Sequence, residues 1–279
     1  MNIGIRLHDT AGHSLEEHLR SAHEQGFTCV HIAMQKVIPG FAMLEAPTLL
    51  NEELAAQVRA LLEKYELQCA VLGCYLNLAT PDEEALAKNV ACYKAHLRFA
   101  RMIGALVTGT ETGAPNTGYK TCPECWTEEA LALFIRRLTP VVRYAEEQGA
   151  VLAIEPVCRH IVNTPERAQR VLEQVNSDAL RIILDSVNLL SPENSPRADA
   201  VIADAIERLG DQVRVLHMKD FRVVEGKADV QSMACGLGDM DYTRLLRFAA
   251  AHEGIPMTLE DTVPDNAEAA RLFLERYPL

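Results

Sequence analysis

The feature that most constrains the fold is a regular alternation of short apolar segments with longer amphipathic ones. The apolar segments are six or seven residues long, are bounded by turn residues and are mostly continuous in hydrophobicity, which is typical of strands buried on both faces. There are eight of them: Asn2–His8, Phe27–Ala33, Gln68–Cys74, Ala105–Thr110, Ala150–Glu155, Leu180–Asp185, Val213–Lys219 and Ile255–Glu260. Eight parallel strands joined by helices predict a closed (β/α)8 barrel or a large doubly wound sheet.

The segments between the strands carry helix start and stop signals. Ser14 precedes Leu15–Gln25 as an N-cap, and Gly26 follows that segment. Proline and acidic residues occupy the first turns of several further helices, as helix starts favour. The start signals are Thr80-Pro81-Asp82-Glu83 (for a helix ending near Gly104), Thr127-Glu128-Glu129 (ending before Gly149), Thr164-Pro165-Glu166, Ser195-Pro196 and Asp265-Asn266-Ala267-Glu268.

The choice between barrel and sheet depends on the first strand and on the linkers. No G-x-G-x-x-G motif follows the first strand, since Gly4 lies inside it, and this disfavours a dinucleotide-binding sheet. No low-complexity tract or Ser/Gly-rich linker divides the 279 residues. We therefore predict a single-domain (β/α)8 TIM barrel over residues 1–279.

Charge and composition exclude several classes of partner. The chain has 27 Lys and Arg against 39 Asp and Glu, a net charge of −12, which argues against a nucleic-acid-binding surface. The longest uncharged stretch, Leu67–Pro81, is too short to span a bilayer. Charged residues at Arg6 and Asp9 disfavour a signal peptide, and the eight cysteines are too scattered for a disulfide scaffold. We expect a cytoplasmic protein with reduced thiols, bound neither to nucleic acid nor to a membrane.

Polar residues at the strand ends are the candidate functional groups, because the active face of such barrels lies at the carboxyl ends of the strands. A single carboxylate just past a strand often only marks where the chain meets water. Here four successive strands each deliver an acid or an imidazole, and three carboxylates packed together would raise one another's pKa unless a cation neutralised them. The sequence thus predicts one divalent metal ion held by Glu155, Asp185, His217 and Glu260.

Three oxygen donors and one imidazole, without thiolate, suit Mn²⁺ best among the candidates Mn²⁺, Mg²⁺, Co²⁺ and Zn²⁺. Neighbouring oxygens of a hydroxy-carbonyl compound would occupy the remaining coordination positions. The ion would then polarise the carbonyl and stabilise an enediolate as an adjacent C–H proton leaves. Glu155 and Glu260 come from strands three steps apart in the ring, so they can act as bases from opposite sides.

Taken together, the motifs in the second half of the chain resemble the xylose isomerase-like TIM-barrel superfamily, and more narrowly its sugar-phosphate isomerase/epimerase branch. The resemblance is strongest from Gly149 to the end and weak before Ala105. The motifs are E-P-x-x-R-H-x-x-N-T (Glu155 to Thr164), L-D-x-x-N (Leu184 to Asn188), H-x-K-D (His217 to Asp220), G-x-G-x-x-D-Y (Gly236 to Tyr242) and L-E-D-T (Leu259 to Thr262).

The resemblance implies the same four metal ligands and acid/base roles for Glu155 and Glu260, as in the ketose 3-epimerases of that superfamily. It also implies that Arg159 and Lys219 lie close to the substrate and that Asp220 orients the His217 side. Relatives are commonly dimers or tetramers, so a homo-oligomer is compatible with it.

Two positions depart from the epimerase pattern. Ile161 stands where those enzymes often have a second Glu, and Asn188 stands where they commonly have a His. Both positions touch substrate in those relatives. The metal site therefore transfers better than the substrate does.

Weaker signals complete the list. His8 ends the first predicted strand with Arg6 facing the same way, and we favour His8 as a substrate contact over a packed core residue. The long loop Gly109–Trp126 is a candidate lid. Its single C-x-x-C, Cys122–Cys125, is a weak zinc signal, better explained as a structural or accidental pair. The histidines expected to be solvated are His13, His18, His23, His96 and His252.

The leading prediction is a metal-dependent isomerase or epimerase acting on a hydroxy-carbonyl sugar or sugar phosphate, or another polyol-derived small molecule. A dehydratase of the inosose or dehydroshikimate type is the alternative, because it shares the enolisation step. A nuclease like endonuclease IV is less favoured, since it needs a histidine-rich three-metal cluster and a basic surface. A non-catalytic binding protein would not need the four strand-end residues.

Overall fold

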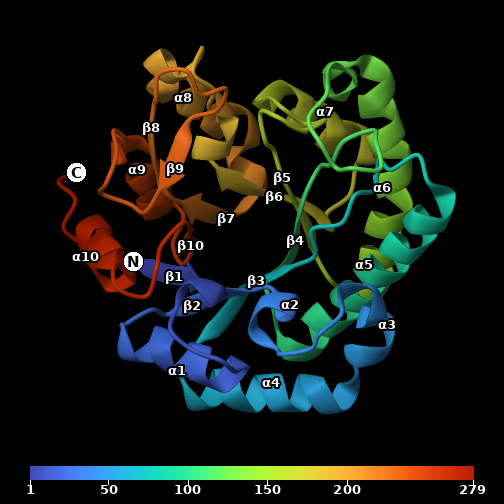
Figure 1. The fold of residues 1–279 in the computed structure, drawn as a ribbon, viewed down its shortest axis with the longest axis horizontal. Coiled ribbons are helices and arrows are strands. Elements are labelled where there is room, and N and C mark those ends of the chain that lie inside the picture. Colours follow the sequence, from blue (N-terminus) through green and yellow to red (C-terminus); the bar gives the residue numbers. More distant parts are fainter.

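The computed structural model describes all residues, 1–279, and contains a closed barrel of parallel strands in the order β1-β10-β7-β6-β5-β4-β3-β2 (Figure 1). The predicted (β/α)8 barrel is thus confirmed. The barrel strands are β1 Asn2–Arg6, β2 Cys29–Ile32, β3 Gln68–Gly73, β4 Val107–Glu111, β5 Leu152–Glu155, β6 Leu180–Asp185, β7 Val213–Met218 and β10 Pro256–Leu259.

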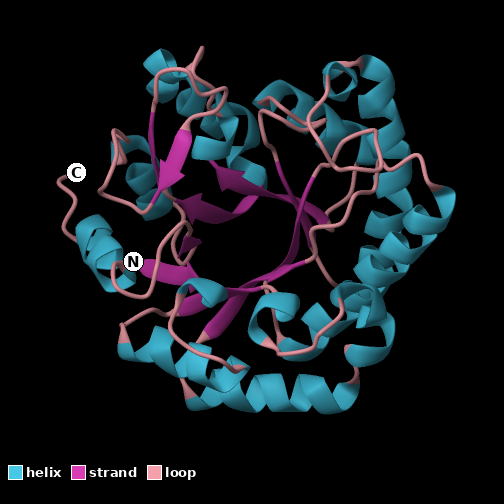
Figure 2. Ribbon diagram, in the orientation of Figure 1, coloured by secondary structure: helices cyan, strands magenta, loops and turns pink.

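Helices surround the barrel on its outside (Figure 2). They are α1 Leu15–Glu24, α2 Met34–Val37, α3 Ala46–Leu49, α4 Glu52–Lys64, α5 Glu83–Ile103, α6 Glu128–Gln148, α7 Pro165–Val175, α8 Ala198–Leu209, α9 Thr243–Ala251 and α10 Ala267–Glu275. Each long helix follows a strand and leads back to the next one, so the carboxyl ends of all eight strands meet on one rim.

Side-chain caps explain where several helices begin. The Ser14, Thr127 and Thr164 hydroxyls accept hydrogen bonds from the backbone N–H three residues on, at 3.2–3.3 Å. Gly104 and Gly149 end α5 and α6 in the left-handed conformation, at φ of 72° and 61°. These start and stop signals are therefore where the sequence predicts them.

The core has two layers. A large cluster fills the space between helices and barrel, and a small one fills the barrel interior. The interior cluster consists of Cys29, Ala70, Val71, Val107, Ala153, Ile183 and Val215. Two strand glycines make room for it: a Cβ on Gly4 would lie 2.3 Å from the Cys29 carbonyl oxygen, and one on Gly109 would lie 2.6 Å from Val71 Cγ1. The barrel is therefore packed solid beneath its rim.

Two of the histidines expected at the surface are buried, so that prediction is wrong for them. His18 lies with its Nδ1 3.0 Å from the Thr10 hydroxyl, and His96 lies with its Nδ1 2.8 Å from the Cys92 carbonyl. Both occupy inner faces of their helices, where the imidazole packs against apolar neighbours. His13 and His23 are exposed as predicted, and His252 is half-buried.

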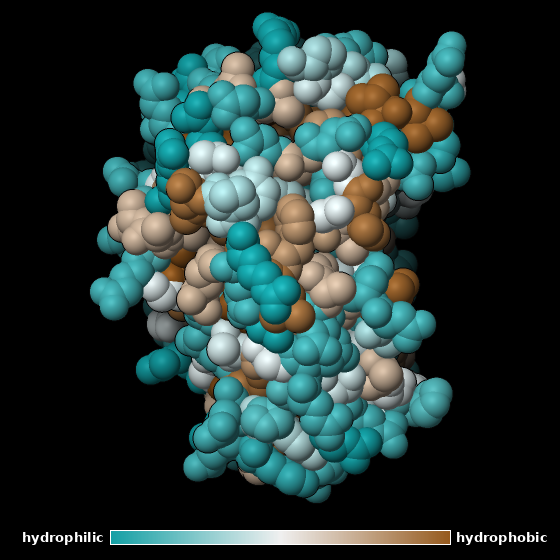
Figure 3. All heavy atoms as spheres, turned by 90° about the vertical axis from the view of Figure 1, so that its left-hand side faces the viewer, coloured by the Kyte–Doolittle hydropathy of each residue, from teal (hydrophilic) through white to brown (hydrophobic).

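A small antiparallel hairpin, β8 Asp220–Arg222 paired with β9 Gln231–Met233, follows β7 and is not part of the barrel. No pattern in the sequence predicts this hairpin. The face of the molecule drawn in Figure 3 is mainly hydrophilic, with apolar residues in small groups. Among the helices, none combines the length and the apolar character that crossing a membrane requires.

Candidate active site

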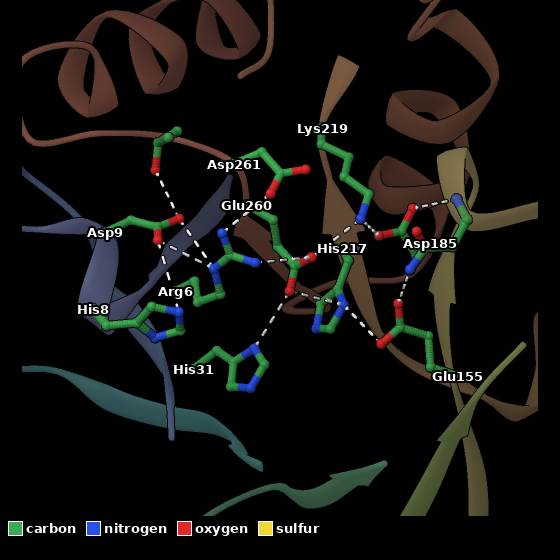
Figure 4. A network of polar contacts seen from close by, with 12 residues as sticks. Arg6, His8, Asp9, His31, Glu155, Asp185, His217, Lys219, Glu260 and Asp261 are labelled. Atoms are coloured by element: carbon green, nitrogen blue, oxygen red, sulfur yellow. Dashed lines mark hydrogen bonds and ion pairs between the residues drawn. The ribbon is translucent and has the colours of Figure 1, made fainter. Parts of the chain in front are cut away.

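The ends of four neighbouring strands bring the predicted ligands into one buried cluster (Figure 4). Glu155 ends β5, Asp185 ends β6, His217 lies near the end of β7, and Glu260 directly follows β10. The Nδ1 atom of His217 lies 3.2 Å from Glu155 Oε2 and 3.3 Å from Glu260 Oε1. The two glutamates therefore stand on either side of the imidazole.

Lys219 and Asn188 tie the cluster together. The Nζ atom of Lys219 lies 2.8 Å from Asp185 Oδ2 and 3.3 Å from Glu260 Oε2. The Asn188 side-chain amide donates to Glu155 Oε1 at 2.5 Å, and its backbone N–H donates to Asp185 Oδ1 at 3.0 Å. At least one oxygen of each carboxylate is therefore contacted by Lys219 or Asn188, and both oxygens of Asp185 are.

The charges in this cluster shift one another's pKa values. Burial raises the pKa of Asp185 to about 6, against the opposing effect of Lys219. Burial also acts to raise the pKa of Glu260, but the His217 and Lys219 cations outweigh it and hold that pKa well below its usual range. Burial opposes a charge on His217, yet Glu260 and Glu155 prevail and raise the pKa of the imidazole to about 9. The His217 and Lys219 cations, with Arg6 beside Glu260, therefore balance the buried carboxylates.

The donor set fits one divalent metal ion. Two groups with donor atoms within 4.8 Å of one another share His217: one with Glu155 and Asp185, the other with His31 and Glu260. Both ring nitrogens of His217 are buried without an aligned hydrogen-bond partner. The same holds for Asp185 Oδ2, although the Lys219 ammonium lies close to it. Buried polar atoms in this state suit coordination to a cation. Carboxylate and imidazole donors match Mn²⁺, Mg²⁺, Co²⁺ or Zn²⁺.

A cavity of about 420 Å³ opens above the cluster, a size typical of small-molecule sites. All four residues predicted to contact substrate, His8, Arg159, Asn188 and Lys219, line this cavity. Its other lining residues are Arg6, His31, Ala33, Gln35, Lys36, Tyr75, Glu111, Glu155, Ser232, Glu260 and Asp261. Their contact with a substrate stays a prediction.

The end of β1 differs from the prediction. The strand stops at Arg6, and His8 lies in a 3-10 turn, Leu7–Asp9, rather than at a strand end. Arg6 points into the cluster, with Nη1 3.8 Å from Glu260 Oε2 and with Nη2 donating to Asp261 Oδ1 at 3.2 Å. Burial, reinforced by the neighbouring Arg6 charge, lowers the pKa of His8 to about 3. His8 therefore faces the cavity as a neutral imidazole.

Asp220 does not orient His217, so that prediction is wrong. Its carboxylate accepts hydrogen bonds from the backbone N–H groups of Phe221, Gly236 and Met240, at 2.8–3.0 Å. Alternation along an extended chain explains this, because Lys219 is two residues from His217 and shares its face whereas Asp220 does not. Asp220 instead holds the hairpin and the turn that follows it.

Two side chains of this site received no role from the sequence. Glu111 ends β4 in register with Glu155, and its Oε2 lies 3.3 Å from the Tyr119 hydroxyl and 3.5 Å from His160 Nδ1. His31 lies in β2, stacked on His217 with ring centroids 5.3 Å apart. The rule that identified the four ligands, a polar residue at a strand end, applies to β4 as well and would have identified Glu111.

A parallel (β/α)8 barrel with a cluster of carboxylates and an imidazole at its carboxyl rim defines a class of barrel enzymes whose chemistry lies at the strand ends. Within that class, the chain belongs to the xylose isomerase-like TIM barrel family, whose model matches residues 19–277. The expected resemblance is thereby confirmed. Among curated proteins no match was found.

Several solved structures share the fold over almost the whole chain. The 3-keto-D-glucoside 4-epimerase of E. coli is 17% identical with a TM-score of 0.75, each chain being covered to 99%. The probable 3-DHS dehydratase AsbF of Bacillus anthracis is 12% identical with a TM-score of 0.77, both chains being covered completely, at 100%. The IOLI protein with a bound zinc atom is 17% identical with a TM-score of 0.73, covering 99% of this chain and 96% of that one. The family and its structural relatives are mostly enzymes, in agreement with the prediction of an enzyme.

Proposed function

We propose that this protein is a divalent-metal-dependent isomerase or epimerase that moves a proton on a hydroxy-carbonyl sugar or sugar phosphate. The observation that carries the proposal is the placement of Glu155 and Glu260 on either side of His217, at the floor of a small-molecule cavity. The likeness to a 3-keto-D-glucoside 4-epimerase supports it, because that reaction also exchanges a proton next to a carbonyl.

In this proposal Glu155, Asp185, His217 and Glu260 would hold one ion, with Mn²⁺ as the first candidate. The zinc atom in the IOLI structure supports the presence of a metal site on this scaffold. When bound, the ion supplies Lewis-acid polarisation of the substrate's oxygens and so makes the neighbouring C–H bond more acidic.

The protein's own groups then handle the proton. Epimerisation removes a proton from one face of a carbon and returns one to the other face, which needs two acid/base groups on opposite sides. Glu260, whose pKa the His217 and Lys219 cations hold low, is ionised and able to accept a proton. The Asn188 amide fixes one oxygen of Glu155 and leaves Oε2 directed towards His217. The Lys219 ammonium stabilises negative charge that develops on the substrate oxygens.

The test is exchange of substrate C–H protons with solvent D₂O, followed by NMR over a panel of keto- and aldo-sugars and their phosphates with Mn²⁺ present. Glu155→Gln and Glu260→Gln should each slow exchange by about 10²-fold or more. The matched control is Glu124→Gln, which removes an exposed carboxylate in the loop outside the cavity. Absence of exchange across the whole panel in the metal-loaded protein would contradict the proposal.

A dehydratase is the second candidate, and one observation favours it. Besides the two glutamates, the cavity is lined by Glu111 and by the Lys219 ammonium, and an elimination needs an additional acid to protonate the departing hydroxyl. The likeness to a probable 3-DHS dehydratase agrees with this. Release of water with growth of an enone absorbance band would favour elimination, whereas proton exchange without that band favours the epimerase.

A further inference from the structure

The long loop between β4 and α6 carries a pair of thiols that the proposed reaction does not use. Cys122 Sγ and Cys125 Sγ lie 3.6 Å apart, and the Cys125 backbone N–H donates to the Cys122 carbonyl at 3.0 Å. Pro123 fixes the backbone of the turn that joins them, the 3-10 helix Pro123–Trp126. The two sulfurs are therefore already held close to bonding distance.

Exposure gives the two cysteines different properties. Cys122 is half-buried and open to solvent, whereas Cys125 is fully buried and its pKa is raised by burial. The side-chain amide of Asn116 donates a hydrogen bond to Cys122 Sγ at 3.4 Å. By contrast Cys29, Cys69 and Cys74 lie in the core with no exposed sulfur.

From this geometry we propose that Cys122 and Cys125 form a reversible thiol–disulfide site that reacts with low-molecular-weight disulfides such as oxidised glutathione. The Cys122 thiolate attacks one sulfur of the oxidant, forming a mixed disulfide between Cys122 and one half of the oxidant. The other half leaves as a small thiolate. The Cys125 thiolate then attacks Cys122 Sγ and releases the second. Two protein thiols are oxidised, one small disulfide is reduced to two thiols, and the two protons pass to the released thiolates.

Loop size explains why the bond is a reversible one. A disulfide stabilises a protein mainly in proportion to the chain it constrains, and this one closes a loop of only four residues, Cys122 to Cys125. It therefore adds less to the free energy of unfolding than a disulfide between distant segments would, and less stability opposes its reduction. A structural disulfide would instead join distant segments.

The two thiols are connected to the cavity through hydrogen bonds of the same loop. Forming the bond shortens the distance between the sulfurs from 3.6 Å to about 2.05 Å, so at least one sulfur moves, and Cys122 Sγ is the one that contacts Asn116. The Asn116 carbonyl also accepts a hydrogen bond from the Asn77 side chain at 2.9 Å, and Tyr119, three residues on, donates to Glu111 in the cavity. A displaced Cys122 Sγ would remove one contact of the Asn116 side chain next to Tyr119, while its two hydrogen bonds with Lys120 would remain. That this changes catalysis rests on the proposed function; the thiol chemistry itself does not.

The test is a redox titration of the full chain read by mass. The protein is equilibrated with mixtures of reduced and oxidised glutathione, quenched with acid, alkylated and digested with trypsin. Cleavage after Lys120 and Arg136 gives one peptide that contains both cysteines and no others. As the share of oxidised glutathione rises, we expect the doubly alkylated peptide to be replaced by an unalkylated peptide whose mass is two hydrogens below that of the reduced peptide. Full alkylation at every ratio, or a stable glutathione adduct on Cys122, would overturn the proposal.

Trp126, the chain's only tryptophan, gives a second readout because it follows Cys125 directly. We expect its emission to fall on oxidation, since a neighbouring disulfide quenches indole fluorescence, and to recover with dithiothreitol. The change should vanish in Cys122→Ser and persist in Cys92→Ser, which removes a buried thiol in α5. Equal quenching in Cys122→Ser would contradict the assignment. Faster hydrogen exchange of amides 114–120 in the oxidised protein is the expected sign of the lost Asn116 contact, and unchanged exchange would remove the link to the cavity.

Discussion

Lys219, together with His217 and Arg6, provides the positive charge that balances the buried carboxylates at the rim. Its ammonium lies between Asp185 and Glu260, which come from strands on either side of β7. A bound metal ion would provide the same balance from a different position. Lys219 and a bound ion would therefore each offset part of the negative charge of the buried carboxylates.

Replacing this lysine should therefore destabilise the metal-free protein. We expect Lys219→Met to lower the free energy of unfolding by about 3 kcal/mol with chelator present, because two buried carboxylates lose their partner. Saturating Mn²⁺ should restore part of that loss. Urea unfolding with chelator and with Mn²⁺ measures both effects.

The control for this experiment is Lys88→Met, since Lys88 pairs with Glu84 on an exposed helix surface. Such a pair is screened by water and contributes little, so this variant should unfold like the wild type. Identical unfolding of the two variants would show that Lys219 does not balance the cluster.

His96 makes the stability depend on pH. Burial lowers the pKa of His96 to about 4, below its value in the unfolded chain, so protonation favours unfolding. The stability from the neutral form is fully present above the unfolded pKa of about 6.5 and is lost as the pH falls towards the folded value. From pH 7 to pH 5 the wild type should lose roughly 1–2 kcal/mol more than His96→Leu.

Urea unfolding at the two pH values measures this difference, and the exposed His13→Gln serves as the control. An equal loss in the wild type and in His96→Leu would mean that the buried imidazole does not contribute to acid sensitivity.

Among the strands, β1 depends on a residue without a side chain. A Cβ on Gly4 would meet the backbone carbonyl of Cys29 in β2 at 2.3 Å, and backbone in a paired strand cannot move aside. We expect Gly4→Ala to lower the free energy of unfolding by about 3 kcal/mol. Gly118→Ala is the control, because its Cβ would meet nothing closer than 3.6 Å. Thermal unfolding compares the two, and equal melting temperatures would refute the steric argument.

The regular elements were predictable because their signals are local. Strands such as Leu180–Asp185 are continuous apolar runs, and helix ends are marked by caps such as Thr164 and Gly149. The hairpin β8–β9 was not predictable, because its strands are only three residues long and show no regular alternation of apolar and polar residues. The predicted first strand extends beyond Arg6, where β1 ends, because Leu7 is apolar. In the structure Leu7 begins a 3-10 turn instead.

The candidate site was predictable to the extent that strand ends determine it. Glu155, Asp185, His217 and Glu260 each follow from their position in a strand, and the structure brings them together. The direction of Asp220 and the stacking of His31 on His217 depend on side-chain alternation and on packing across the barrel. The alternation could have been read from the spacing of His217, Lys219 and Asp220, whereas the stacking of His31 depends on tertiary structure and has no signal in a single sequence.

For the whole molecule, the cluster links four strands, so an ion bound there should stabilise the entire fold. A ligand that binds only the folded state adds about 2.7 kcal/mol at roughly 100 times its dissociation constant. We expect Mn²⁺ to raise the melting temperature of the wild type by several degrees and to leave Asp185→Asn nearly unchanged. Asp178→Asn, which alters an exposed carboxylate, should respond like the wild type. Calorimetry with and without the ion decides this, and an equal response of Asp185→Asn would exclude Asp185 as a ligand.

The pairing of β1 with β10 closes the barrel between the first and last strands of the chain, and Glu260 lies at the end of that last strand. During synthesis on the ribosome, β1 waits with one edge unpaired until β10 has emerged from the exit tunnel. The cluster of Glu155, Asp185, His217 and Glu260 is completed by the same event. If the proposed ion binds there, a nascent chain would acquire it only once the barrel can close, so that metal binding would mark the end of folding rather than guide its beginning.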